Sequence, residues 1–159
     1  MSFALSPEAA QAIRAKDSIK ILATVGQEGS PHAVVKNSLT LLDDGTIAFY
    51  ELIETSQTQK NLVYSIWFNK LAAITVLTQD GKSYQVKGIP RKVIIAGQRF
   101  LDAYTDVQKN IGPDIDLSAV WLIVPSEERE QTFLVRRDIE ESQHPYEIHV
   151  DRIVKEEYR

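Results

Sequence analysis

Three short glycine-containing turns, each between two apolar segments, constrain the fold of this chain more than any other feature. They are QEGSP at 27–31, DDGT at 43–46 and QDGK at 79–82. Before the first turn, Ile19, Ile21, Ala23 and Val25 recur at every second position, which is the period of a strand with one buried face. Turns this short join neighbouring strands, so we expect the segments on either side of them to pair antiparallel.

The expected strands are numerous and rich in branched residues. Isoleucine and valine total 29 residues against 13 leucines, a bias that suits a pleated sheet. The segments that read as strands are 19–25, 33–42, 46–52, 71–78 and 84–96. Apolar runs at 119–125 and 132–137 extend the expected number to between five and seven.

Helices are few, and their starts are marked by capping residues. We predict helices over about 7–16, 57–68 and 98–109. Ser6 and Pro7 suit the start of the first, and Ser56 with Gln59 has the form of a capping box at the start of the second. Hairpin-linked strands with few helices indicate a mainly β fold, either a small antiparallel β-barrel with flanking helices or an α+β sandwich, rather than a parallel doubly wound sheet.

The length of 159 residues fits one domain, which we place at 1–136, followed by a charged tail at 137–159. The net charge of −4 lies entirely in residues 126–159, with ten acidic and six basic side chains, so nucleic acid is a disfavoured partner. No apolar run is long enough to span a membrane, and the first residues do not resemble a signal peptide. The absence of cysteine fits the cytoplasm and excludes thiolate chemistry.

No motif for a catalytic nucleophile or a large nucleotide-binding loop occurs in the sequence. His144 and His149 lie five residues apart around Pro145, which is not the three- or four-residue spacing of metal ligands on a helix. We therefore expect no metal site.

The segment ETSQTQKNL at 54–62 concentrates polar side chains at the predicted start of the second helix. Unpaired backbone N–H groups and the helix dipole favour an anion there, and hydroxyl and ammonium groups could complete a phosphate site. A helix cap surrounded by solvated polar residues would look the same, so both interpretations stay open. The candidate ligands are Thr55, Ser56, Thr58, Lys60 and Asn61.

A second candidate segment is SYQVKGIPRK at 83–92. Gly88 within a strand indicates a bulge or a close approach to a planar group, and Gln85 on the same strand could donate and accept hydrogen bonds. A surface glutamine beside a bend in a barrel is the alternative, and it is the more common arrangement.

In their order, these segments resemble the FMN-binding split-barrel family typified by pyridoxamine 5′-phosphate oxidase. The resemblance covers about residues 8–125. It rests on a leading helix, Gly29-Ser30-Pro31 before AVVKNSLTLL, a D-G turn before AFYE, Thr58-Gln59-Lys60 at a helix start, and a later Y-Q-V-x-G block at 84–88.

The resemblance implies an antiparallel FMN-binding split barrel and a homodimer with FMN in its interface. It implies that Thr58 and Lys60 bind the FMN phosphate, that Tyr50 and Glu51 line the isoalloxazine ring, and that Gln85 contacts the flavin. The family's oxidases carry an arginine and a lysine where this chain has Val34 and Leu39. Lys36, with its neighbour Asn37, is the nearest replacement, and the oxidases' C-terminal arginine motif is not recognisable in 126–159.

The leading hypothesis is an FMN-dependent oxidoreductase that acts on a small-molecule substrate or electron donor, with the catalytic residues unknown. A non-catalytic carrier or sensor of flavin or haem is the alternative, and a structural dimer without a cofactor is a third. A deazaflavin in place of FMN also stays open, since relatives of the family use one.

Overall fold

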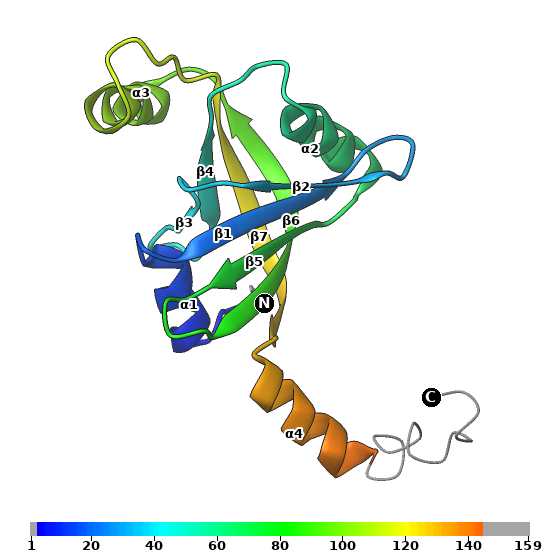
Figure 1. Ribbon diagram of the computed structural model, residues 1–159. Coiled ribbons are helices and arrows are strands. Elements are labelled where there is room, and N and C mark those ends of the chain that lie inside the picture. Colours follow the sequence, from blue (N-terminus) through cyan, green and yellow to red (C-terminus); the bar gives the residue numbers. More distant parts are fainter. Residues whose placement is uncertain (1–2, 145–159) are drawn as a thin grey trace, which may run out of the picture.

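The computed structural model describes residues 3–144, and within them the chain forms one antiparallel sheet flanked by helices (Figure 1). The strands are β1 (Ile19–Val25), β2 (Pro31–Val35), β3 (Thr40–Leu41), β4 (Ile47–Glu51), β5 (Ala72–Leu77), β6 (Ser83–Ile94) and β7 (Ala119–Glu130). The helices are α1 (Pro7–Arg14), α2 (Gln57–Phe68), α3 (Gln98–Asn110) and α4 (Phe133–Gln143). The predicted helices at 7–16, 57–68 and 98–109 are therefore confirmed to within two residues.

The sheet has the strand order β2-β1-β5-β6-β7-β4-β3, and every pair of neighbours is antiparallel. It curls into a half-barrel in which the long strands β6 and β7 form the spine (Figure 1). This confirms the antiparallel strand pairing that the hairpin turns predicted and the split barrel that the family resemblance implied.

Gly88 bends the spine of the sheet. The β6–β7 register shifts between Lys87 and Gly88. A Cβ atom on Gly88 would lie 2.5 Å from Ile123 Cγ2 and 2.9 Å from the Val124 carbonyl oxygen, so only glycine lets the two strands approach this closely. The bulge predicted at this glycine is thus present.

Alternate residues of the strands fill the inside of the half-barrel with one apolar core. Its largest side chains are Trp121 and Phe49, and α1 contributes Ala9, Ala12 and Ile13 to it. A second, smaller core lies between α3 and the other face of β4 and β7, around Val107 and Val120. Because adjacent side chains of a strand point to opposite sides of the sheet, β4 contributes residues to both cores.

The predicted strand over 33–42 is wrong in its middle. β2 ends at Val35, the chain turns at 36–39, and only Thr40 and Leu41 form β3. Leu39 N–H donates to the Lys36 carbonyl at 3.1 Å, which closes the turn and lets Leu39 enter the core with no exposed surface. Burial of Leu39 overrides the strand pattern of its neighbours.

The apolar run at 132–137 is also not a strand. It begins α4, because β6 starts at Ser83 and offers no further residues for pairing, and Ser83 already accepts from Gln131 N and donates to Thr132 Oγ1. The predicted boundary between residues 136 and 137 therefore falls inside a helix. Of the tail predicted at 137–159, residues 145–159 lie outside the described residues.

The start of α2 and the cavity beside it

The first turn of α2 is capped as the sequence predicts. Ser56 Oγ accepts a hydrogen bond from Gln59 N–H at 3.0 Å. The reciprocal half of the predicted capping box does not form, because Gln59 Oε1 instead accepts from the indole Nε1–H of Trp121 at 2.6 Å. This bond joins the first turn of α2 to the largest buried side chain of the core.

Asn61 joins the same helix to strand β1. Its side chain is buried, and its Nδ2 donates to Thr24 Oγ1 at 3.0 Å while its Oδ1 accepts from Gln57 Nε2 at 2.7 Å. Gly26 follows β1 directly, and a Cβ there would lie 2.8 Å from Asn61 Oδ1. The lack of a side chain at Gly26 therefore lets the chain leave β1 across the top of α2's first turn.

These anchors divide the polar residues of the first turn into two groups. Thr58 and Asn61 point inward and are buried, whereas Thr55, Gln57 and Lys60 are exposed. Within residues 3–144, the Lys60 ammonium has no hydrogen-bond or ion-pair partner. An exposed cation at the positive end of a helix is the part of this segment suited to an anionic ligand.

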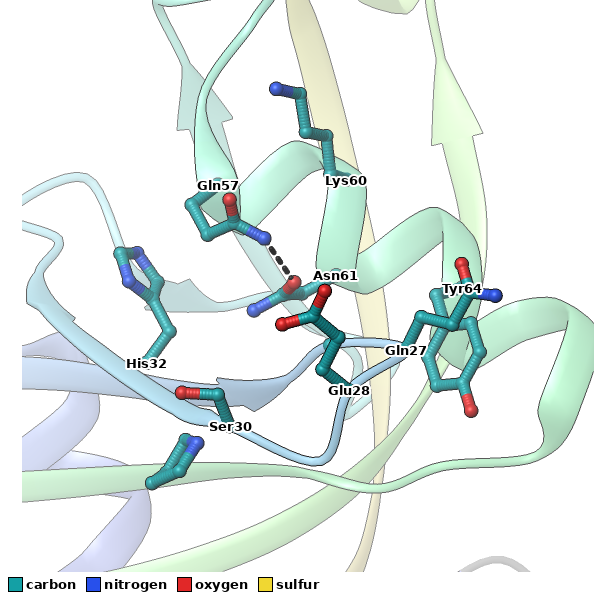
Figure 2. A pocket seen from close by; sticks show the side chains of 10 residues that line it. Gln27, Glu28, Ser30, His32, Gln57, Lys60, Asn61 and Tyr64 are labelled. Carbon is teal, nitrogen blue, oxygen red and sulfur yellow. Dashed lines mark hydrogen bonds between the residues drawn. The ribbon is translucent and has the colours of Figure 1, made fainter.

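A cavity of ≈ 870 Å³ opens between this part of α2 and the β1–β2 connection (Figure 2). In Figure 2, Gln57, Lys60, Asn61 and Tyr64 extend from the helix, while Gln27, Glu28, Ser30 and His32 come from the connection and the start of β2. The spacing of the helix residues, three and four apart, places them on one face. The cavity brings together two of the predicted ligands, Lys60 and Asn61.

The residues of the β1–β2 connection were not predicted as ligands from the sequence. Glu28, Ser30 and His32 lie around the Gly29-Ser30-Pro31 turn, which the sequence marks only as a turn. The sequence feature that could have indicated a site here is the occurrence of one acidic, one hydroxyl and one imidazole side chain within five residues. Strands β1 and β2 pair antiparallel, and the connection between them lines the same cavity as α2.

Lys36 and Glu51, both predicted ligands, lie together and form an ion pair with each other. Lys36 Nζ donates to Glu51 Oε2 at 2.8 Å and lies 5.3 Å from the centre of the Phe49 ring. The Glu51 side chain is only 2% exposed, and its other oxygen accepts from Ile53 N–H at 3.2 Å. This ion pair ties the turn after β2 to the end of β4, and neither residue lines the cavity beside α2.

The remaining predicted ligands lie elsewhere. Tyr50 is on the opposite face of β4 from Glu51 and packs against the α3 core, where burial, with a contribution from Asp106, raises the pKa of its hydroxyl. Gln85 is half-buried on the outer face of the sheet, opposite Thr75 of β5. Asn37 is exposed in the turn between β2 and β3.

Two further properties of the described residues bear on function. Within residues 3–144 no group of three or more His, Asp or Glu side chains is arranged to hold a metal ion. In the same part of the chain no helix is both long enough and apolar enough to cross a membrane.

No protein-family model matches the sequence, and no curated protein matches it. Solved structures do share its fold. HupZ of Group A Streptococcus has a TM-score of 0.66 at 22% identity, over 81% of this chain and 95% of that one. A putative pyridoxamine 5′-phosphate oxidase of Lactobacillus delbrueckii has a TM-score of 0.60 at 18% identity, over 79% and 93%. An FMN-binding protein of Syntrophomonas wolfei has a TM-score of 0.61 at 13% identity, over 79% and 86%.

The chain therefore has the split-barrel fold of the proteins related to pyridoxamine 5′-phosphate oxidase.

Proposed function

We propose that this protein binds FMN, with the flavin phosphate at the start of α2 beside Lys60. The observation that carries the proposal is the ≈ 870 Å³ cavity, which places an unpaired ammonium and the start of a helix at one wall. Ligand sites for molecules of this size occupy roughly 300–1,000 Å³. The fold's relatives include FMN-binding proteins, which supports flavin as the ligand class.

The donor set fits a phosphate group. A phosphate monoester carries about −1.5 to −2 charges and needs several donors. Lys60 offers three N–H donors, and Ser30 and Gln57 add a hydroxyl and an amide at the cavity wall. Glu28 lines the same cavity, so charge repulsion favours the phosphate on the α2 side rather than beside the connection.

The residues at two positions that are basic in the family's oxidases argue against the oxidation of pyridoxamine 5′-phosphate as the reaction. Leu39 stands where the family's oxidases have a lysine, and it is part of the core. Val34 stands in place of their arginine, and Lys36 is neutralised by Glu51. We therefore propose a flavin-dependent oxidoreductase for another small-molecule substrate or electron donor, with the flavin supplying the redox chemistry.

We also propose that the protein is a homodimer that pairs through the outer face of β1, β2 and β5. Ile19 lies opposite Leu77, and Ile21 lies opposite Val35, on this face of the sheet. Ile19, Val35 and Leu77 are 47%, 56% and 41% exposed. An apolar sheet face of this kind is typical of a protein–protein interface.

The absorbance spectrum of the purified protein, followed by titration with FMN and riboflavin, tests the proposal. We expect FMN to bind more tightly than riboflavin, because riboflavin lacks the phosphate. Reduction of the bound flavin by a nicotinamide donor would support the oxidoreductase, and a flavoprotein inert to donors would identify a carrier or sensor. Equal affinity for the two flavins, or no binding of either, would refute a phosphate site at Lys60.

A further inference from the structure

Within residues 3–144, helix α4 is joined to the sheet at its start but has no fully buried residue. It is 11 residues long and buries none of them, and Phe133 and Leu134 are 72% and 56% exposed. Isolated helices shorter than about 12–15 residues are marginal in water. The ion pair between Arg137 and Glu141, four residues apart and exposed, adds little to the stability of the helix. A helix of this length with exposed aromatic and aliphatic side chains therefore requires a surface to pack on.

A second apolar surface without a partner lies at the C-terminal end of α2. It consists of Val63, Ile66, Trp67, Phe68 and Leu71, all exposed, and we refer to it as the α2 patch. Trp67 is 77% exposed and Phe68 is 60% exposed. The Phe68 ring packs against Tyr64 of its own helix, at 4.6 Å between ring centres. Exposed tryptophan and phenylalanine in one cluster are typical of an interface rather than of free surface.

The two surfaces are complementary in charge as well as in polarity. Between Glu54 and Asp80 the chain has no acidic residue and two lysines, Lys60 and Lys70. Helix α4 carries three acidic and two basic side chains, and one of the basic ones, Arg137, already pairs within the helix. An acidic, apolar helix thus matches an acid-free, apolar patch flanked by lysines.

One chain cannot bring these two surfaces together. Helix α4 extends away from the lower end of the barrel, whereas α2 lies against its upper part (Figure 1). The start of α4 is held at the lower end by Thr132 Oγ1, which accepts from Ser83 N–H at 3.0 Å at the beginning of β6. In a two-fold dimer whose barrels run in opposite directions, the lower end of each barrel lies beside the upper end of the other.

We propose that α4 is an exchanged arm, and that in the homodimer it packs on the α2 patch of the second copy. The contact is isologous, so it forms twice in each dimer. It rests on the homodimer of the proposed function, and it goes further by placing a partner helix along α2, the helix that carries Lys60. The flavin cavity is then bordered by both copies.

Cross-linking between differently tagged chains tests this contact, because the natural sequence has no cysteine. One variant carries Lys70→Cys beside the patch, and the other carries Glu140→Cys on the arm, so that both apolar surfaces stay intact. After mixing and re-equilibration with a short bis-maleimide, we expect a Lys70–Glu140 cross-link between chains. As matched control, Lys109→Cys on α3 replaces Glu140→Cys and should give at least tenfold less product.

A second measurement uses Trp67, since Trp121 is fully buried. On raising the concentration through the dimer transition, we expect tryptophan emission of the full chain to shift to shorter wavelength. In Phe133→Ser/Leu134→Ser the shift should be lost and the dimer should dissociate at least about tenfold more readily. Cross-linking only between two Glu140→Cys chains, equal product with the α3 control, or a wavelength shift unaffected by the arm mutations would overturn the exchange.

FMN titration of the same samples separates the two proposals. A dimer that binds FMN but fails to cross-link contradicts the exchanged arm and leaves the flavin site in place. Cross-linking without FMN binding contradicts the flavin proposal and leaves the arm in place.

Discussion

At the scale of single residues, the polar side chains near α2 differ in whether their bonds are already made. Thr58 and Asn61 are buried, and both ends of the Asn61 amide are paired with protein atoms. Lys36 is paired with Glu51, whereas Lys60 extends from the helix without a partner within residues 3–144. The sequence does not distinguish these residues, whereas the structure separates an exposed cation at a cavity from side chains that are bonded within the protein.

Replacing Lys60 with alanine tests the phosphate site. Charge-assisted hydrogen bonds are worth roughly 1.5–3 kcal/mol each, so Lys60→Ala should weaken FMN about 10–100-fold and leave riboflavin nearly unaffected. Fluorescence titration with both flavins measures this. Lys70→Ala, an exposed lysine just after the same helix, is the matched control and should change neither affinity.

The cap of the helix gives a contrasting result if the phosphate proposal is correct. Ser56→Ala removes the acceptor for Gln59 N–H and should lower the free energy of unfolding by about 1 kcal/mol. It should not discriminate FMN from riboflavin. If Ser56→Ala is selective for FMN and Lys60→Ala is not, the phosphate lies at the cap rather than at the lysine.

The Lys36–Glu51 pair predicts a stability effect. Lys36→Met leaves the carboxylate of Glu51 buried without its cation, which should lower the free energy of unfolding by about 3 kcal/mol. The double variant Lys36→Met/Glu51→Gln removes the uncompensated charge and should recover most of the loss. Urea denaturation of both variants measures the difference, and equal losses in the two would show that the ion pair is not what stabilises this turn.

Because Lys20 is buried, we expect its contribution to the free energy of unfolding to depend on pH. The residue is 3% exposed on the inner side of β1, and burial lowers the pKa of its ammonium, with a smaller opposing effect of Asp17. Between the lowered value and the ordinary 10.5, the unfolded chain binds more protons, so this residue's contribution to stability rises with pH. Lys20→Met should therefore stabilise the fold at pH 7, because it removes a charge that burial disfavours.

The stabilisation by Lys20→Met should shrink as the pH rises from the lowered pKa of Lys20 toward 10.5, and it should vanish well above 10.5, where the lysine is neutral in both states. Denaturation curves at pH 7 and pH 10 check this against Lys20→Arg, which stays charged at both values. A gain from Lys20→Met that is the same at both pH values would assign the effect to packing rather than to charge.

At the scale of elements, the strand pair β6–β7 depends on a close approach that the sequence only suggests. Gly88→Ala would place a methyl group 2.5 Å from Ile123 Cγ2 and 2.9 Å from a backbone carbonyl oxygen. The backbone oxygen cannot move without disturbing the sheet, so we expect a loss of about 1–3 kcal/mol in unfolding free energy.

The control for Gly88→Ala is Gly112→Ala. A Cβ at Gly112 would lie 3.3 Å from Ile115 Cγ1, the end of a side chain that can move, and neither glycine has a positive φ. Thermal denaturation should show Gly112→Ala within about 0.5 kcal/mol of the natural protein. Similar losses at both positions would mean that the bulge tolerates a side chain.

At the scale of the whole molecule, the proposed homodimer depends on the apolar outer face of the sheet. Val35 is 56% exposed on this face, next to Ile21 across the β1–β2 pair. Val35→Glu would bury a carboxylate in the proposed interface and should convert the dimer to a monomer at micromolar concentration, as measured by light scattering. Leu101→Glu on α3, a residue equally exposed, should leave the dimer intact.

The antiparallel strand pairing, three of the helices and the cap at Ser56 could all be predicted from the sequence alone. Each depends on neighbours along the chain, such as turn residues, caps and the two-residue or helical period, and these are visible in sequence.

The tertiary structure was needed to show which polar side chains face a cavity and which are hydrogen-bonded to other parts of the chain. Gln59 binds Trp121, 62 residues away, and Asn61 binds Thr24, 37 residues away. The burial of Leu39 likewise interrupts a predicted strand. Because β6 begins only at Ser83, the apolar run at 132–137 has no residue of β6 to pair with and forms the start of α4. Such outcomes depend on partners that the curl of the sheet brings together, and no local pattern encodes the identity of a distant partner.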